Sequence, residues 1–221
     1  MLILVPTPIG NLQDITLRAI EVLKNADVVL AEDTRTSGIL LKHLQVQTPL
    51  RAYHQHNEHK VLQSLVDELA GGKTMALITD AGTPGISDPG FLLVRACVQQ
   101  GIPVECLPGP TAFVPALVVS GFPINRFVYE GFLPLKKGRH TLFTQWQQEA
   151  RAIVFYESPV RLLKTLREIN NYLPPERHVC VCREISKKFE EHRHGTFAEV
   201  ITHFETHTLK GEIVVVIAPN D

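Results

Sequence analysis

The sequence predicts a two-domain α/β protein whose first half is built around a parallel sheet. Up to residue 120, short apolar runs alternate with segments of about ten residues that have helical spacing, which is the pattern of a parallel α/β sheet. The loops after the apolar runs are rich in Gly, Pro, Asp and Glu, and α/β proteins place ligands at such loops. After Pro123 hairpin-like returns indicate a mixed-sheet α/β domain. We therefore expect an N-terminal domain over 1–112 and a C-terminal domain over 113–221.

The first domain contains apolar runs that we predict as strands and periodic segments that we predict as helices. The strands are expected at Leu2 to Val5, Val28 to Ala31, Met75 to Ile78 and Pro103 to Leu107. The helices are expected at Leu17 to Asn25, Ser37 to Leu44, Val61 to Ala70, Phe91 to Gln100 and a small-residue segment ending at Ser120. Thr16 and Thr111 are typical N-cap residues, and Gly71-Gly72 is typical of a helix end.

The loop that follows Met75 to Ile78 is the strongest candidate for a ligand site. The glycine spacing in it matches the first half of a P-loop, but Phe91-Leu92 stands where that motif needs Lys and Ser or Thr. A ligand with ammonium or hydroxyl groups and no phosphate therefore fits better, with Asp80 as an acceptor. A structural role accounts for Asp88-Pro89, with Asp88 as the N-cap and Pro89 at the first helical position of the next helix.

The second domain is predicted as strands with fewer crossovers. The strands are expected at Arg126 to Phe132, Arg151 to Tyr156, Val179 to Arg183 and Ile213 to Ile217, with a further one at Phe189 to His194. The helices are expected at Thr141 to Ala150, Val160 to Tyr172 and Phe197 to His203. Ser158 and Pro159 make a good N-cap and first turn for the middle helix.

The composition is that of an ordinary globular protein, with 44% hydrophobic and 20% charged residues and a net charge of −1. No apolar run approaches the ~20 residues of a membrane span, and the apolar start is too short for a signal peptide. Cys180 and Cys182 share one face of a predicted strand, but a metal site would need two more ligands. We expect the four cysteines to be buried free thiols of a cytoplasmic protein.

Two polar clusters in the first domain allow both structural and functional interpretations. The run Glu32-Asp33-Thr34-Arg35 is either an ion pair that braces a loop or a source of carboxylates that orient or deprotonate a substrate hydroxyl. The run His54 to His59 lacks two histidines at the i, i+4 spacing of a metal site on a helix, so no metal is expected. A polar loop at the ligand edge is the preferred interpretation, with Asn57 or Glu58 available to a substrate.

Two basic patches in the second half are either solvated surface or a phosphate-tracking surface. Patch 1 comprises Lys136, Lys137, Arg139 and His140, and patch 2 comprises Arg183, Lys187, Lys188, His192, Arg193 and His194. Because the whole chain is near neutral, any nucleic-acid contact must come from such local patches.

Seven short motifs occur together, in order, in a known family. They are Thr7 to Asn11, Ala31 to Arg35, Thr79 to Pro84, Ser87 to Gly90, Pro108 to Ala112, Phe155 to Pro159 and Lys210 to Glu212. The set resembles the cytidine 2′-O-methyltransferases of small-subunit (16S) ribosomal RNA, a branch of the tetrapyrrole methylase family. These enzymes are class III S-adenosylmethionine-dependent methyltransferases. The resemblance extends from Leu2 to about Ala218.

The resemblance implies a tetrapyrrole-methylase-like fold, with S-adenosylmethionine bound in the cleft between the two domains of a homodimer. The methionine part of the cofactor would lie against the Asp80 loop, and Glu157 would add a contact from the second domain. The cofactor-binding residues that it implies are Pro8, Asp80, Thr83, Thr111, Ala112 and Glu157. Longer members of the branch carry a small C-terminal extension after the last strand. If that extension helps to bind RNA, this sequence either binds RNA more weakly or binds it with another surface.

The resemblance also implies an enzyme that methylates the ribose of a decoding-centre cytidine in 16S ribosomal RNA or the small ribosomal subunit, in the cytoplasm, with no membrane and no metal. A ribose hydroxyl is a weak nucleophile and must lie in line with the S–CH3 bond at about 3 Å. Positioning is expected to dominate, and a general base would add about 10²–10⁴-fold. The candidates for orienting or deprotonating the hydroxyl are Glu32, Asp33, Arg35, Asn57, Glu58, Glu184 and Lys187.

Two other functions remain open at this stage. The first is methylation of a porphyrin or corrin precursor, or of the diphthamide intermediate, on the same fold. The motifs at Glu32 to Arg35 and Glu157 to Pro159 argue against it, because they look like the RNA branch. The second is a non-catalytic α/β protein that binds RNA or a nucleotide.

Overall fold

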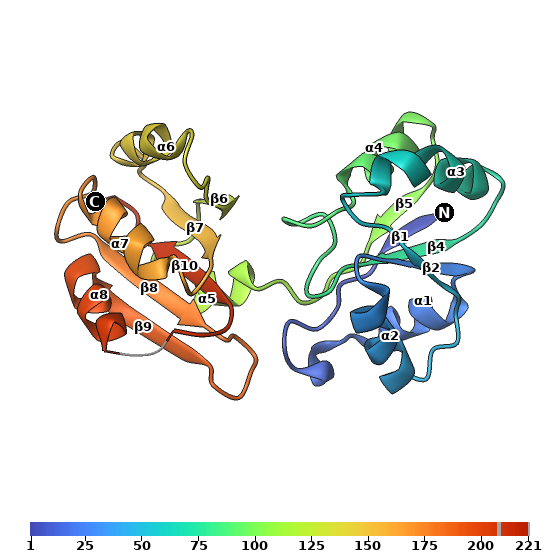
Figure 1. Cartoon of the computed structure of the whole chain (residues 1–221), viewed down its shortest axis with the longest axis horizontal. Helices are drawn as coiled ribbons and strands as arrows, with labels where there is room; N and C mark the ends of the chain where they lie inside the picture. The colour runs from blue at the N-terminus through green and yellow to red at the C-terminus, as the bar shows by residue number, and fades with distance from the viewer. Residues whose placement is uncertain (207–208, 221) are drawn as a thin grey trace. The chain divides into compact units, whose positions relative to one another are not determined.

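The computed structural model describes residues 1–206 and 209–220. The chain divides into two compact units, Met1–Thr111 and Ala112–Asp221, which we call unit 1 and unit 2 (Figure 1). The domains expected from the sequence, 1–112 and 113–221, differ from these units by one residue at the junction.

Unit 1 contains a five-stranded parallel sheet. Its strands are β1 (Leu2–Leu4), β2 (Val28–Ala31), β3 (Leu50–Ala52), β4 (Met75–Ile78) and β5 (Val104–Cys106). Their order in the sheet is β3-β2-β4-β1-β5, so β4 lies between β2 and β1. The register pairs Ala31 of β2 with Ile78 of β4 and Leu4 of β1 with Leu77 of β4, which brings the carboxyl ends of these three strands to one edge.

The helices of unit 1 cover both faces of its sheet. They are η1 (Leu12–Asp14), α1 (Leu17–Asn25), α2 (Thr34–His43), α3 (Glu58–Ala70) and α4 (Phe91–Gln99). Helices α1 and α2 pack on one face, and α3 and α4 pack on the other (Figure 1). Burial on both faces explains why every residue of β2 and β4 is apolar and buried. The chain leaves β1 and β4 toward opposite faces, and such a switch point is where α/β sheets bind ligands.

Several element boundaries in unit 1 follow the predictions. Strands β2 and β4 and helix α1 have the predicted limits, and the Thr16 side chain caps α1 by accepting from the Ala19 amide. Helix α2 begins at Thr34 rather than at Ser37, because the Asp33 side chain caps it.

The predicted cap at Asp88-Pro89 is wrong. Helix α4 begins at Phe91, with Gly90 as the N-cap residue at φ 148°, a backbone conformation that favours glycine. This helix start has no side-chain capping hydrogen bond. The backbone conformation of Gly90, two residues after Asp88, therefore marks the start of α4.

Unit 2 contains a mixed five-stranded sheet, as the sequence predicts. Its strands are β6 (Phe127–Phe132), β7 (Ala152–Glu157), β8 (His178–Arg183), β9 (Glu191–Thr196) and β10 (Ile213–Ile217). The order is β6-β7-β10-β8-β9, in which β6 and β7 are parallel and the other neighbours are antiparallel.

The helices of unit 2 lie mainly on one face of its sheet. They are α5 (Phe113–Val119), α6 (Arg139–Trp146), α7 (Leu162–Asn170) and α8 (Phe197–Glu205). Apolar residues of α6, α7 and α8 form one core with alternate residues of the strands, and α5 contacts β7 and β10 on the other face (Figure 1). Across the described part of the chain, no helix has both the length and the apolar character needed to cross a membrane.

Two predicted helix caps in unit 2 are wrong. Helix α5 begins at Phe113 with Ala112 as its N-cap residue, while Thr111 pairs with Thr83 instead. Helix α7 begins at Leu162 rather than Val160, and Ser158 is not its N-cap. The Ser158 amide donates to the side chain of its own neighbour Glu157 at 2.7 Å, which belongs to the end of β7.

Candidate functional site

The loops after β1 and β4 are joined at the carboxyl edge of unit 1. Thr7 and Gly82 form an antiparallel bridge through two backbone hydrogen bonds of 2.9 and 3.0 Å. The buried Thr7 hydroxyl also donates to the Thr79 carbonyl oxygen at 3.0 Å. Pro8, the next residue along the first loop, is half-buried beside this bridge. The two loops at the switch point of the sheet therefore form one joined surface.

The loop after β5 is held against the same pair of loops. Gly109 approaches the Pro6 ring so closely that a Cβ atom would lie 2.6 Å from a ring carbon, so no other residue fits without a shift. The Thr83 hydroxyl bonds the Pro110 carbonyl oxygen at 3.0 Å and the Thr111 hydroxyl at 2.5 Å. These contacts bring the predicted cofactor residues Thr83 and Thr111 together, with Ala112 following in the chain.

The ends of β2 and β4 bring carboxylates together. The buried Thr79 hydroxyl donates to Glu32 Oε2 at 3.0 Å, and the Asp33 amide donates to Asp80 Oδ1 at 3.3 Å. The prediction that the Glu32-Asp33 cluster and Asp80 converge at one edge is thus confirmed, because both contacts join residues 47 apart in sequence.

Asp33 and Arg35 form the ion pair that the structural interpretation of this cluster predicts. Arg35 donates to both carboxylate oxygens of Asp33, and the Arg35 amide donates to Asp33 Oδ1 at 2.8 Å. These hydrogen bonds lower the pKa of Asp33 to about 2. Asp33 therefore stays ionised as the cap of α2, while the Arg35 side chain remains 89% exposed.

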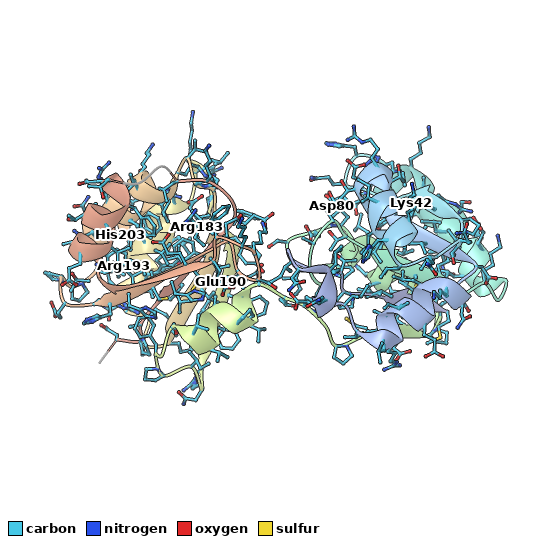
Figure 2. The ribbon with its side chains drawn as sticks, turned by 90° about the horizontal axis from the view of Figure 1, so that it is seen from below. Lys42, Asp80, Arg183, Glu190, Arg193 and His203 are labelled. Carbon is cyan, nitrogen blue, oxygen red and sulfur yellow. The ribbon has the colours of Figure 1, made fainter. Side chains whose placement is uncertain are left out.

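Asp80 differs from Asp33 in its electrostatic environment. Its side chain reaches the surface of unit 1 (Figure 2). Desolvation by the surrounding protein raises the pKa of Asp80, and the charge of Asp33 adds to this effect, while the Asp33 amide and Arg35 oppose it. A raised pKa means that the carboxylate lacks sufficient internal compensation, so a cationic ligand group would stabilise it.

Asp88 is the member of this edge that sequence reasoning missed. Burial, together with the charges of Glu32 and Asp80, raises the pKa of Asp88 to about 6, although the Thr79 side chain acts in the opposite direction. The signal that could have pointed to it was the second aspartate in one strand-to-helix loop, but the Asp-Pro pair favoured a helix cap.

Asn57 and Glu58 lie at the end of β3, the edge strand next to β2. The Asn57 side chain closes the turn after β3, accepting from the His54 amide at 2.9 Å and donating to the Ala52 carbonyl oxygen at 3.1 Å. Glu58 is the first residue of α3, and its carboxylate accepts from the buried Tyr53 hydroxyl at 3.5 Å. The Glu58 side chain therefore makes fewer and longer internal hydrogen bonds than the Asn57 side chain.

Glu157 ends β7 in unit 2 and is only 2% exposed. Its carboxylate accepts from the Ser158 amide and the Thr165 hydroxyl, each at 2.7 Å, and pairs with Arg161 at 2.7 Å. Arg139 of patch 1 joins the network by donating to the Thr165 hydroxyl at 2.7 Å. This network fixes the loop between β7 and α7, and any cofactor contact from the Glu157 position would have to fit around it.

Glu184 and Lys187 join the turn after β8 to the start of β10. Lys187 Nζ lies 2.9 Å from carboxylate oxygens of both Glu184 and Glu212, and the Glu212 amide donates to Glu184 at 3.0 Å. Partial burial opposes the shift, but these hydrogen bonds lower the pKa of Glu184. Gly211 has a positive φ of 88°, and a Cβ atom there would lie 2.2 Å from the Glu184 side chain. This close approach to Glu184 explains why a glycine stands at the centre of the motif Lys210 to Glu212.

In patch 2, the cationic side chains Arg183, Lys187 and His192 are paired with carboxylates within unit 2. Arg183 pairs with Glu191 at 2.9 Å, Glu191 also accepts from His203 at 2.7 Å, and His192 contacts Glu190 at 2.8 Å. Arg183, Glu190, Arg193 and His203 are labelled in Figure 2. In patch 1, Arg139 pairs with Glu168, whereas Lys136, Lys137 and His140 are exposed. A phosphate-tracking role is therefore better supported for patch 1.

The cysteines are present as free thiols, and Cys180 and Cys182 lie on one face of β8 with their sulfur atoms 3.6 Å apart. Cys106 is exposed because β5 is an edge strand. The expectation that all four cysteines are buried is therefore wrong for this residue. Within residues 1–206 and 209–220, no group of three or more His, Cys, Asp or Glu side chains is arranged to hold a metal.

Comparisons with known proteins extend over nearly the whole chain. The profile of Tetrapyrrole (Corrin/Porphyrin) Methylases matches residues 1–201. The ribosomal RNA small subunit methyltransferase I of Synechocystis sp. is 48% identical over 219 residues, 99% of this chain and 78% of that protein. The protein of the same name from Thermotoga maritima is 45% identical, over 98% of this chain and 97% of that one. The crystal structure of uroporphyrin-III-C-methyltransferase from Thermus thermophilus shares the fold, with a TM-score of 0.64, 22% identity and coverage of 99% and 91%.

Proposed function

Because the chain belongs to the tetrapyrrole methylase family, we propose that it transfers a methyl group from S-adenosylmethionine to a ribose 2′-hydroxyl of small-subunit ribosomal RNA. The observation that carries the proposal is the 48% and 45% identity, over 98–99% of the chain, to two proteins named ribosomal RNA small subunit methyltransferase I. We infer a decoding-centre cytidine of 16S ribosomal RNA as the acceptor, from the same motifs that define the RNA branch.

The residues at the edge of unit 1 fit S-adenosylmethionine. The loop after β4 lacks the lysine of a phosphate-binding loop, and its Asp80 carboxylate is exposed with a raised pKa. Such a group suits the ammonium and hydroxyl groups of this cofactor. We assign Pro8, Asp80, Thr83, Thr111 and Ala112 to cofactor binding, with Glu157 as a positioning residue for the loop after β7. When bound, the cofactor supplies a methyl group on an electron-poor sulfonium.

The chain's own contribution to methyl transfer is orientation and proton removal. Glu32, at the end of β2, is our first candidate for accepting the proton of the ribose hydroxyl, because Thr79 holds its carboxylate at the joined edge. Asp33 and Arg35 are assigned to orienting the substrate, since their ion pair leaves the Arg35 side chain exposed. Glu58 and Asn57 from the neighbouring strand end, and Glu184 and Lys187 from unit 2, remain secondary candidates.

The proposal extends to RNA binding by patch 1, to a homodimer and to the cytoplasm. Exposed Lys136 and Lys137 are suited to phosphate contacts. Free cysteines are typical of proteins in a reducing compartment. Light scattering should give about twice the chain mass of 24.7 kDa, and a single-chain mass at working concentration would remove the homodimer from the proposal.

The test is transfer of tritium from methyl-labelled S-adenosylmethionine to small ribosomal subunits, compared with free ribosomal RNA and with uroporphyrinogen. We expect label in the RNA substrates. After alkaline hydrolysis the label should stay in dinucleotides, because a 2′-O-methyl group blocks cleavage of the next phosphodiester bond. Label in mononucleotides would exclude ribose methylation, and label in uroporphyrinogen alone would favour the tetrapyrrole alternative.

A further inference from the structure

A row of aromatic side chains lies along β6, an edge strand of the unit 2 sheet (Figure 1). Successive rings contact one another, with centroids between 4.7 and 6.2 Å apart. In order, the rings of this aromatic row belong to Phe127, Phe113, Tyr129, Tyr156 and Phe132. The two end residues are the most exposed, at 40% for Phe127 and 58% for Phe132, and the three between them are half-buried.

A β-bulge places Phe132 in the aromatic row. In a regular strand, Phe127 and Tyr129 share one face, and Phe132, three residues after Tyr129, would point to the other. The register of β6 against β7 shifts between Tyr129 and Phe132, and Gly131 has a positive φ of 61°. The shifted register pairs Phe132 with Tyr156, whose ring it contacts at a centroid distance of 5.5 Å. The bulge thus gathers the three aromatic side chains of β6 on one face.

The aromatic row lies on the face of the sheet opposite the main core of unit 2. Phe155 of β7 belongs to the core with α6, α7 and α8, so the next residue, Tyr156, points the other way. Helix α5 packs on that side and supplies Phe113. Glu130, the one carboxylate of β6, accepts from the core residue Trp146 at 3.1 Å. The negative charge of the strand is therefore turned away from the row.

Cationic side chains flank β6 at both ends. Arg126 directly precedes the strand, and Lys136 and Lys137 of patch 1 follow it. All three residues are exposed. Exposed rings beside cations are the combination that binds single-stranded nucleic acid, because bases stack on the rings while phosphates contact the cations. The same cations argue against an apolar protein partner, because charged residues are depleted at the core of protein interfaces.

We propose that the aromatic row is a base-stacking surface for an unpaired segment of the RNA substrate, whose phosphates contact Arg126, Lys136 and Lys137. This inference rests on the proposed function, which gives the chain an RNA substrate. Bases stack on Phe127 and Phe132, the exposed ends of the row, and the half-buried rings between them hold these two in place. Every base has a π-face, so this surface contributes affinity for unpaired RNA and does not select the acceptor nucleotide.

The experiment measures binding of decaadenylate, an unpaired oligoribonucleotide, to the full chain by fluorescence anisotropy. Phe132→Ala should weaken this binding about tenfold, because a base loses its stacking partner. A decamer of abasic ribose phosphates keeps the phosphates without the bases, so the wild type and Phe132→Ala should bind it equally. The slope of log affinity for decaadenylate against log salt concentration should not change, because no cation is removed.

Two control variants separate stacking from a general effect of substitution. Phe132→Trp keeps an aromatic face and should bind decaadenylate within about twofold of the wild type. Its added fluorescence should be quenched by the bases, whereas the native Trp146 is 2% exposed and provides a constant background. Phe91→Ala removes a ring of α4 that is 65% exposed and should bind as the wild type does. If Phe132→Ala does not fold, Phe127→Ala takes its place.

Weaker binding of decaadenylate by Phe132→Ala, with unchanged binding of the abasic decamer, supports the inference. Equal affinities of Phe132→Ala and Phe91→Ala for decaadenylate would overturn it, while methyl transfer to ribosomal RNA would leave the proposed function intact. Loss of a dimer in Phe132→Ala with unchanged decaadenylate binding would also overturn it, because the row would then join two copies of the chain. Absence of label transfer to every RNA substrate would overturn the proposed function, and the inference with it.

Discussion

Carboxylates at the edge of unit 1 and carboxylates in unit 2 have the same chemistry but different surroundings. In unit 2, Glu157 is buried with three partners, and Glu184 is held by Lys187 and the Glu212 amide. In unit 1, Asp80 is exposed and accepts from the Asp33 amide at a long 3.3 Å. Desolvation raises its pKa, whereas hydrogen bonds lower the pKa of Glu184.

The difference shows how to separate structural from functional carboxylates in one protein. A carboxylate whose oxygens are all occupied by cations, amides or hydroxyls contributes to the stability of the fold. A carboxylate that is desolvated by its neighbours without matching partners gains most from a cationic ligand. On this criterion Asp80 of unit 1 is the carboxylate that we propose to bind a ligand, whereas Glu157 and Glu184 of unit 2 hold turns.

The largest effect is expected for Glu157→Ala. Removing this buried carboxylate leaves Arg161 and Thr165 without their acceptor, so the free energy of unfolding of unit 2 should fall by about 3–5 kcal/mol. Differential scanning calorimetry would detect this as a lower Tm of one transition. The matched control is Glu205→Ala, which removes the exposed Arg167–Glu205 pair and should cost about 0–1 kcal/mol. Equal losses in the two variants would contradict the comparison.

Asp80→Ala should weaken binding of S-adenosylmethionine by about 10- to 100-fold, because a charged acceptor for the cofactor is lost. Isothermal titration calorimetry measures the change in Kd. Stability should change little, because the side chain is exposed. Asp67→Ala, at an exposed position on α3, is the control that should bind the cofactor as the wild type does. Unchanged affinity in Asp80→Ala would refute the assignment of this residue.

Asp88→Asn should stabilise unit 1 at neutral pH. The folded protein raises the pKa of Asp88 from 3.8 to about 6, so the wild type loses stability as the pH rises between these values. The gap corresponds to about 3 kcal/mol, which partial exposure reduces to about 1–2 kcal/mol. Urea unfolding at pH 7 should show this gain, and at pH below about 3.8 it should vanish. A gain that is equal at both pH values would mean that ionisation is not its cause.

The smallest effect is expected for the double variant Lys136→Ala and Lys137→Ala. If patch 1 contacts phosphates, the slope of log affinity against log salt concentration for small ribosomal subunits should fall by about 1–2. Filter binding at several KCl concentrations measures this slope. Lys24→Ala, an exposed cation of α1, serves as the control. A slope that matches the control would exclude patch 1 from RNA binding.

Local patterns predicted the regular elements well. Strands β2, β4 and β10 and helix α1 have the predicted limits, because continuous apolar runs and a Thr16 cap are properties of neighbouring residues. The convergence of Glu32 and Asp80 was also predictable, since parallel strands end at one edge.

The predicted caps at Asp88, Thr111 and Ser158 are wrong. The Thr111 hydroxyl bonds the Thr83 hydroxyl, 28 residues away, which local capping rules do not include. The Ser158 hydroxyl accepts from Arg161 Nε at 3.2 Å, and the N-cap residue of α4 is Gly90, with no side-chain cap. The Asp88-Pro89 pair is typical of a helix start, so the sequence pattern predicted a cap at Asp88 instead of a place at the site.

The sequence by itself determined that this is an α/β protein of the tetrapyrrole methylase family, and it predicted a ligand edge without a phosphate cradle at the loop around Asp80. Apolar periodicity and ordered motifs carry that information, because both are properties of the linear chain. Only the tertiary structure decided which charges are already paired. Hydrogen bonds and ion pairs depend on distances of about 3 Å that only the folded chain fixes. The structure therefore shows that the Glu157 carboxylate has three partners, whereas Asp80 accepts one long hydrogen bond from the Asp33 amide.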